Sequence, residues 1–285
     1  MRKLLKLLGI IVLVIAIALV VMGFRGRSIV EATYGSTFRL IDTLPDSIDL
    51  AEADRWTILT GCRDCHGEDL SGEVMIDAPP FLVVAPNLTR GTGGVAADYE
   101  TAADWDRAIR YRIRPDGTGM LPMMPSENYH HLSDADLMRI IAAVRAAPPV
   151  DRELPSTRVR LMGLPIAGIG VLHPSDDQPD APAGPTPPAA PTADYGAYLA
   201  RLTCVECHGE DLRGGPTPGG GPKATDLAAA GLWSYEAFAE AVTRGVAPGG
   251  RRLAEQMPSP SFSVLTETEL RALQAYLATL LTEER

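Results

Sequence analysis

The most apolar part of the chain lies at its N-terminus. An uncharged run from Leu7 to Phe24 follows three basic residues, Arg2, Lys3 and Lys6. Eighteen residues of helix span about 27 Å, close to the hydrocarbon thickness of a bilayer. The run exceeds the apolar part of a typical cleaved signal peptide and lacks a small-residue cleavage pattern. Residues 1–27 are therefore predicted to be a retained membrane anchor, with a removed signal as the alternative.

Beyond this run, apolar side chains recur at helical spacing in six segments. Several segments begin at a residue that can cap a helix, such as Asp49 and Ser133. No run of alternating β-branched residues predicts a strand. The pattern predicts an all-α fold of short helices and long loops, with helices at residues 48–61, 101–113, 133–144, 194–202, 234–246 and 266–281.

The last three helices repeat the first three, because the two halves share an ordered set of motifs. Residues 61–70 (GCRDCHGEDL) match residues 203–212 (TCVECHGEDL), and a Met-Pro pair follows in each half, at Met124 and Met257. The offset is 142 residues at the cysteines and 133 at the methionines, so the second copy is shorter by nine loop residues. We therefore predict two tandem domains, at residues 45–147 and 193–285.

Residues 148–192, between the two copies, are rich in Pro, Ala and Asp and are predicted to form a semi-rigid linker. Within this linker, residues 159–172 are apolar but contain three glycines, and they are too short to cross a bilayer. The simplest interpretation is that they pack across the first domain. Contact with a membrane surface or a partner protein is the alternative.

Composition narrows the class of protein. The chain has 46% hydrophobic and 22% charged residues, which excludes wholesale disorder. Its net charge is −10 and it has no basic stripe, which argues against a nucleic-acid partner. All four cysteines fall in two C-x-x-C pairs, so a disulfide-dense scaffold is excluded.

Each C-x-x-C pair is followed directly by a histidine, and C-x-x-C-H is the attachment motif of a c-type haem. Two thiols on one helical face can bond the two vinyl groups of one porphyrin, and the imidazole can then ligate the iron. A thioredoxin-like redox pair would need a βαβ context, and a zinc site would need the pairs to lie close together. We therefore predict two covalently bound haem c groups, held by Cys62, Cys65 and His66 and by Cys204, Cys207 and His208.

A haem iron takes a sixth ligand or keeps an open site, and Met/His ligation is typical of electron-carrying cytochromes c. Met257 is the only methionine after position 204. In the first copy Met120, Met123 and Met124 compete, and the repeat favours Met124 because Pro125 follows it. Met123 is the alternative ligand; otherwise Met120 and Met123 are expected to fill the core. The predicted axial ligands of the haem iron are thus His66 with Met124 and His208 with Met257.

Other side chains carry weaker signals. His130 and His131 stand just before a predicted helix cap and are expected to be exposed to solvent. Arg110, Arg112 and Arg114 are expected to line a solvated helix face, with neutralisation of haem propionates as the alternative.

Together, these motifs resemble class I cytochrome c domains. The sequence around Cys62, residues 86–89 (PNLT), Met124-Pro125-Ser126 and Tyr129 is similar to the multi-haem cytochrome subunits of membrane-bound alcohol and gluconate dehydrogenases. Those subunits usually have three haem domains and a C-terminal anchor, whereas this chain has two copies and an N-terminal apolar run. The resemblance implies a small all-α globule around each haem, consistent with only 6% aromatic residues. It also implies that a proline carbonyl, from Pro86 or Pro80, orients the axial histidine.

The sequence therefore predicts a di-haem cytochrome that relays single electrons between a membrane-associated donor and a periplasmic or membrane acceptor. It would be an electron carrier rather than an enzyme, anchored by one helix in the inner membrane with its haem domains in the periplasm. Its partners would be a dehydrogenase, a quinol-oxidising complex, an oxidase or a soluble cytochrome. The alternatives are a cytochrome subunit of a membrane-bound dehydrogenase complex, a di-haem peroxidase with one open haem, and a haem-based sensor.

Overall fold

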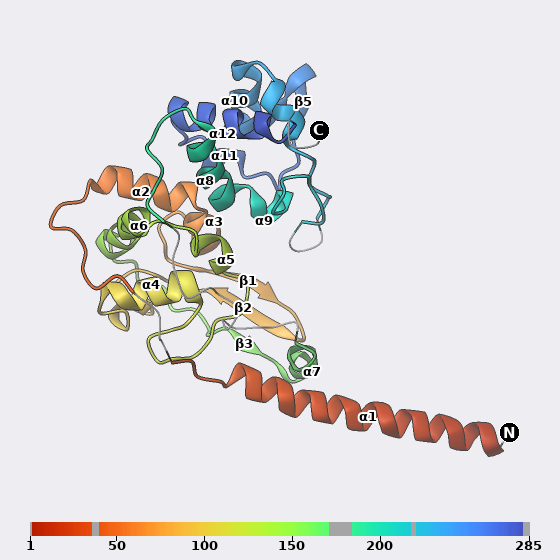
Figure 1. The fold of residues 1–285 in the computed structure, drawn as a ribbon. Coiled ribbons are helices and arrows are strands. Elements are labelled where there is room, and N and C mark those ends of the chain that lie inside the picture. The colour runs from red at the N-terminus through yellow and green to blue at the C-terminus, as the bar shows by residue number, and fades with distance from the viewer. Residues whose placement is uncertain (1, 36–39, 171–183, 218–220, 282–285) are drawn as a thin grey trace.

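A long N-terminal helix projects from a mostly helical body in the computed structural model (Figure 1). The structure describes residues 2–35, 40–170, 184–217 and 221–281. The helix, α1 (Arg2–Val30), has 29 residues and a mean hydropathy of 3.2 over its most apolar window. By length and composition it is the one helix of the described residues that could cross a membrane. Within the described residues, no part of that apolar window is buried in the body.

The first copy of the repeat contains the three helices that the sequence predicts, and two short ones. Asp49 caps α2 by accepting hydrogen bonds from the backbone N–H groups of Ala51 and Glu52, and Ser133 caps α6 in a similar way. The apolar faces of α2 and α6 pack against each other, with Trp56 and Ile140 almost fully buried. The helices are α2 (Leu50–Leu59), α3 (Cys62–His66), α4 (Ala102–Tyr111), α5 (Ser126–Tyr129) and α6 (Asp134–Ala146), with the 3-10 turn η1 (Val95–Ala97).

The second copy repeats this arrangement, and its three longer helices also confirm the predictions. Thr266 opens α12 with a capping box that includes Glu269, and α12 packs along α8. Gly196 allows that close approach, because a Cβ there would lie 1.9 Å from the backbone oxygen of Ala272. The elements are α8 (Ala193–Thr203), α9 (Val205–His208), η4 (Ala228–Leu232), α10 (Tyr235–Arg244), η5 (Pro248–Gly250), α11 (Ser259–Phe262) and α12 (Glu267–Thr279).

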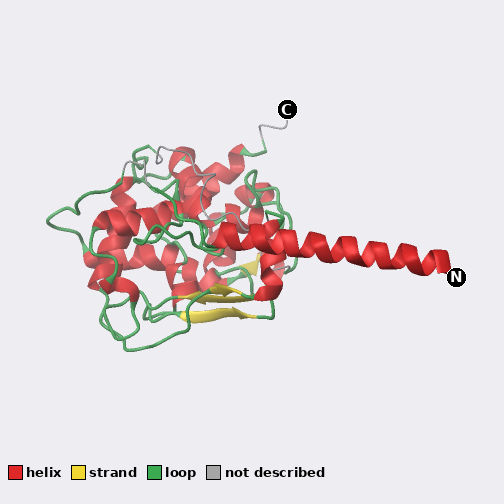
Figure 2. Cartoon of the chain, turned by 90° about the horizontal axis from the view of Figure 1, so that it is seen from below, coloured by secondary structure: helices red, strands yellow, loops and turns green. Residues whose placement is uncertain are grey.

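The expectation of an all-α chain needs a correction, because the structure contains short antiparallel strands. In the first copy β1 (Glu73–Asp77) pairs with β2 (Phe81–Ala85), with a bulge between Val74 and Ile76, and β2 pairs with β3 (Arg158–Val159). In the described part of the second copy, β4 (Val246–Ala247) pairs with β5 (Arg251–Arg252). Figure 2 shows the strands on one side of an otherwise helical body. The β1–β2 hairpin forms because the turn at Pro79 and Pro80 folds the apolar run of β2 back onto β1, and β3, far along the chain, then pairs with the other edge of β2.

The first part of the predicted linker lies against the first copy. The Asn87 amide donates to the carbonyl oxygen of Val150 over 2.8 Å, and the backbone N–H of Arg152 donates to Thr92 over 3.0 Å. Thr157 exchanges two hydrogen bonds with the backbone of Val84. Residues 171–183 of the predicted linker, which include His173 and the end of the apolar stretch, lie outside the described residues.

The apolar stretch that begins at residue 159 packs against both the first copy and α1. It forms η2 (Leu161–Gly163) and α7 (Leu164–Gly168), and α7 lies across the C-terminal end of α1 (Figure 1). A Cβ at Gly26 would lie 1.8 Å from the Leu164 carbonyl oxygen, and one at Gly168 would lie 2.0 Å from that of Met22. Glycine at both positions is what allows the two backbones to approach so closely.

Candidate functional site

The first Cys-His motif forms one tight turn of helix between two glycines. Gly61, with φ of 76°, ends α2 and begins α3, and Gly67, with φ of 81°, ends α3. Both glycines adopt the left-handed region, where a side chain would add strain. The turn therefore places Cys62, Cys65 and His66 on one short helix directly after α2.

The His66 ring is oriented by a backbone carbonyl. Its Nδ1 lies 2.8 Å from the carbonyl oxygen of Pro86, and because a carbonyl only accepts, Nδ1 carries the proton. Burial lowers the pKa of His66, so the ring is held neutral and Nε2 keeps a free lone pair. Pro80, the other candidate acceptor, instead accepts a hydrogen bond from the backbone N–H of Arg160. A neutral, oriented imidazole of this kind is the form that ligates a metal.

The second motif has the same geometry. The Nδ1 of His208 lies 2.8 Å from the carbonyl oxygen of Thr225, so this ring is also oriented by a backbone acceptor. After each histidine the chain makes the same turn: Leu70 and Leu212 adopt left-handed φ values of 61° and 57°. The acceptor in this copy is not a proline, which departs from the expectation drawn from the resemblance. A carbonyl oxygen is supplied by every residue, so the backbone path and not the side chain determines this contact.

None of the four cysteines, all within the described part of the chain, is in a disulfide bond. In each motif the first thiol lies beside a threonine hydroxyl, with Cys62 Sγ 3.5 Å from Thr60 Oγ1 and Cys204 Sγ 3.4 Å from Thr203 Oγ1. Burial raises the pKa of both Cys62 and Cys204 to about 11, so these thiols stay protonated at neutral pH. Among the described residues, no group of three or more His, Cys, Asp or Glu side chains is placed to share a metal ion.

The methionine loops of the two copies match each other. Ser126 donates its backbone N–H to Met124 and Ser259 donates to Met257, each over 2.8 Å. Both methionines are half-buried and pack against the core, whereas Met123 is 50% exposed. The expectation that Met123 fills the core is therefore wrong.

Met120 occupies a different position in the repeat. Its backbone N–H donates to the Arg112 carbonyl over 2.7 Å, and in the second copy Leu253 makes the equivalent bond to Gly245 over 2.8 Å. Because a leucine stands at this position in the second copy, the structural match pairs Met124 rather than Met120 with Met257. Met120 packs against the core, as expected for a core-filling residue.

The arginines of α4 do not form a solvated face, and that expectation is wrong. The Arg110 side chain is fully buried and bonds Asp106, Asp134 and the Leu132 carbonyl. Arg114 donates to Thr118 and to the Gly119 carbonyl. Both side chains therefore bond to other groups of the protein, and the backbone N–H of Ile41 donates to Asp106, the partner of Arg110.

Arg112 differs from its neighbours. It is 3% exposed, and its Nη2 bonds Glu127 at 2.6 Å, while its Nε and Nη1 are buried without a partner among the described residues. Its φ of 54° lies in the left-handed region, at a position where the second copy has Gly245. A strained arginine with two unsatisfied buried donors fits a site built for an anionic group, such as a haem propionate.

His130 is also buried, at 2% exposure, contrary to the expectation of solvent contact. Its ring packs edge-on to that of Tyr111, with centroids 5.4 Å apart, because α5 turns the chain inward just before α6. Tyr129, one residue earlier, donates its hydroxyl to the Thr60 carbonyl over 2.7 Å and so ties the methionine loop to the Cys-His motif. Two other residues contact the motifs: the Thr225 carbonyl accepts from His208, and the Asn128 amide donates to Glu206. Neither residue could be predicted from the sequence motifs.

Comparison with known proteins agrees with this geometry. The family model described as Cytochrome c matches residues 193–281. Similar proteins include the gluconate 2-dehydrogenase cytochrome c subunit of Pantoea cypripedii, 38% identical over 96 residues, which are 28% of this chain and 21% of that protein. The fructose dehydrogenase cytochrome subunit of Gluconobacter japonicus is 30% identical over 108 residues, which are 36% of this chain and 22% of that protein.

A third relative is the cytochrome c subunit of the alcohol dehydrogenase (quinone) of Gluconacetobacter polyoxogenes, 37% identical over 94 residues, which are 28% of this chain and 20% of that protein. The match thus spans about a fifth of the length of each of these relatives. Residues 193–281 thus match the cytochrome c family model, and parts of the chain are similar to cytochrome subunits of dehydrogenases.

Proposed function

We propose that both copies of the repeat bind a haem covalently and that the chain carries single electrons. The observation that supports this most strongly is the match between the two histidines, each of which donates Nδ1–H to a backbone carbonyl over 2.8 Å directly after a C-x-x-C pair. A family model covers only the second copy, but the first has the same motif, turn and methionine loop. The residues that would hold the two haems are Cys62, Cys65, His66 and Met124, and Cys204, Cys207, His208 and Met257.

The side chains of each copy have separate tasks. With a haem bound, the two thiols would attach the porphyrin, and the Nε2 of the neutral histidine and the methionine thioether would be the protein ligands of the iron. A bound haem supplies reversible one-electron chemistry, and Met/His ligation raises its potential. A methionine in both copies supports a carrier rather than a peroxidase, which would need one open haem.

We infer that the carrier serves a dehydrogenase as its cytochrome subunit. The relatives are named as subunits of gluconate, fructose and alcohol dehydrogenases, and each is described by its cytochrome rather than by a catalytic role. A quinol-oxidising complex, an oxidase or a soluble cytochrome would be the other partner. Copurification from detergent-solubilised membranes, with subunits identified by mass, tests this assignment, and recovery of the chain alone would count against it.

We further propose that α1 is a retained anchor in the inner membrane, with both copies in the periplasm. The close packing of α1 on α7, at Gly26 and at Gly168, supports retention, because removal of α1 would leave the surface of α7 uncovered. Carbonate washing should leave the protein in the membrane fraction. A mature N-terminus near Arg25 would show that the segment is removed.

Haem content tests the central proposal. The purified protein should give about two haems per polypeptide in a pyridine haemochrome assay. Changing Cys204 and Cys207 to Ala should leave one covalent haem, and so should the matched change of Cys62 and Cys65. A single haem in the unchanged protein, lost with only one of these pairs, would limit the function to one copy.

A further inference from the structure

The two copies touch each other through equivalent residues. The Asn128 amide donates to the Glu206 carboxylate over 2.8 Å, and the Ser261 hydroxyl donates to the Asp64 carboxylate over 2.7 Å. Asp64 and Glu206 are the same position in the repeat, the second residue between the cysteines of each motif. Asn128 and Ser261 are also the same position, four residues after Met124 and Met257. Each Cys-His motif therefore contacts the methionine-side helix of the other copy.

This reciprocal pattern is that of an isologous interface, in which residue i of one unit contacts residue j of the other and j contacts i. Such an interface brings the same surface of both units together. Here that surface includes α3 and α5 of the first copy and α9 and α11 of the second. The contacts that define this surface, Asn128 with Glu206 and Ser261 with Asp64, join residues far apart in sequence.

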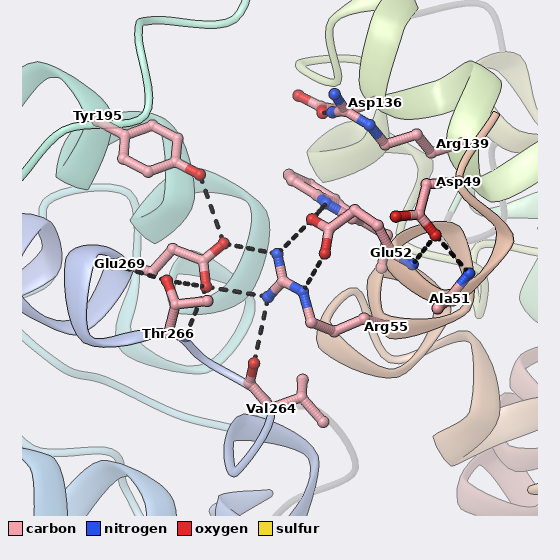
Figure 3. A network of polar contacts seen from close by, with 11 residues as sticks. Asp49, Ala51, Glu52, Arg55, Asp136, Arg139, Tyr195, Val264, Thr266 and Glu269 are labelled. Atoms are coloured by element: carbon pink, nitrogen blue, oxygen red, sulfur yellow. Dashed lines mark hydrogen bonds and ion pairs between the residues drawn. The ribbon is translucent and has the colours of Figure 1, made fainter. Parts of the chain in front are cut away.

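A larger polar network, around Arg55 and Glu269, also joins the two copies (Figure 3). Arg55 of α2 makes two hydrogen bonds of 2.9 Å with the Glu269 carboxylate of α12 and a third, of 3.2 Å, with the Val264 carbonyl. Glu52 holds the other side of the guanidinium, at 2.7 and 2.8 Å. The Glu269 side chain is 4% exposed and that of Arg55 is 18% exposed, so this is a largely buried, two-bond ion pair between the copies.

The interface also contains buried apolar side chains and a further polar contact, between Tyr198 and α6. Buried apolar side chains of both copies form one contiguous cluster rather than two. Tyr198 of α8 donates its hydroxyl to Asp136 of α6 over 2.6 Å and accepts the backbone N–H of Ser133 over 3.1 Å. Two tethered domains that moved independently would not share a core, so these contacts indicate one fixed arrangement.

We propose that this interface is an internal electron-transfer contact, which holds each haem-attachment segment against the methionine-side helix of the other copy in a single orientation. The proposal rests on the proposed function, because it requires a haem in each copy. One electron passes from the reduced haem of one copy to the oxidised haem of the other, so that one iron is oxidised as the other is reduced, and no proton or co-reactant is needed. Asn128, Ser261 and Arg55 are positioning residues for this contact, since they act through the motifs they hold.

The test uses the full chain in detergent and begins with haem content. The first variant is Asn128→Ala combined with Ser261→Ala, and the second is Arg55→Gln. The matched control is Arg271→Gln, which removes an arginine paired with Glu267 on the same helix at the surface. Ser261→Thr, which keeps the hydroxyl, is the conservative companion of the first variant. All four should retain the haem content of the unchanged protein.

Two chromophores held at a fixed angle couple, so the unchanged protein should show a bisignate circular dichroism couplet in the Soret band. The couplet should be lost in the two interface variants and kept in the control and in Ser261→Thr. The concentration-independent phase of electron exchange, followed after pulse reduction, should slow in the same two variants. Two haems without a couplet, or a couplet and an exchange phase that survive both interface variants, would overturn this proposal and leave the two-haem function intact. Fewer than two haems in the unchanged protein would instead refute the proposed two-haem function, on which this proposal rests.

Discussion

The buried arginine of α4 gives a sharp test of how the first copy is stabilised. Arg110 and Asp106 are both fully buried, and Arg110 also bonds the Leu132 carbonyl at 2.7 Å and Asp134 at 3.0 Å. In Arg110→Leu, Asp106 keeps one donor, the backbone N–H of Ile41 at 2.8 Å. An uncompensated buried charge costs about 3–5 kcal/mol, so we expect a loss of this size in the free energy of unfolding.

The pH dependence of that loss has a defined sign. Burial raises the pKa of Asp106, and Arg110 opposes this rise, so removing the arginine raises the pKa further. As the pH falls, a carboxyl whose pKa is higher in the folded state is protonated in the folded protein before it is protonated in the unfolded chain. Protonation removes the buried charge, so the cost of that charge to the free energy of unfolding decreases as the pH falls. The deficit of Arg110→Leu should therefore shrink from pH 7 toward pH 5, and adding Asp106→Asn should recover much of it.

Denaturation of the haem-loaded protein, with each variant compared with the unchanged protein at the same pH, measures these effects. Arg271→Leu is the control, because it breaks an exposed pair with Glu267 that is worth less than about 1 kcal/mol. A loss in Arg110→Leu no larger than in this control would show that the buried pair does not stabilise the first copy. A deficit that stays constant with pH would show that Asp106 does not carry the penalty.

The methionine ligand, the packing of α7 and the net charge can each be tested. Met124→Ala should open the first haem to carbon monoxide and lower its potential, whereas Met123→Ala, at an exposed position, should change neither; equal effects would contradict the assignment. Gly168→Val should separate α7 from Met22, seen as faster hydrogen exchange in α7 with unchanged haem content, and unchanged exchange would refute that packing. Because the chain carries a charge of −10, electron transfer to a basic partner should slow with added salt, and a salt-independent rate would exclude steering.

The helices could be predicted because local rules agree with the packing. Asp49, Ser133 and Thr266 cap helices whose apolar faces recur at helical spacing, so sequence and tertiary contacts favour the same structure. The hairpin could not be predicted in this way. Residues 81–85 form a short continuous apolar run, which periodicity cannot assign, and their partner at residues 158–159 is set by tertiary contacts.

The candidate site was predictable where chemistry resides in side chains. The motif spacing gives the thiols and the histidines, but the acceptors of the two rings are backbone carbonyls, which any residue can supply. The burial of Arg110 had a weak signal in the Asp106–Arg110 spacing of four residues, which allows a pair on one helical face. Whether that face meets water or the core depends on the segment at Ile41, which lies far away in sequence.

The difference between the copies at Arg112 allows a final test of the haem assignment. The second copy has Gly245 there, with φ of 68°, and an arginine at φ of 54° carries roughly 1 kcal/mol of backbone strain. If that strain is tolerated because the guanidinium faces a haem propionate, Arg112→Gly should leave the protein folded, since relief of strain offsets the lost pair with Glu127. The potential of the first haem should fall, because a lost positive charge favours the oxidised iron.

Spectroelectrochemical titration of both haems separates this effect from a general disturbance. The second haem, whose copy already has glycine, should keep its potential, and Arg271→Gln should shift neither haem. A first haem whose potential is unmoved by Arg112→Gly, in a protein of normal haem content, would show that the buried donors of Arg112 serve the fold rather than the cofactor.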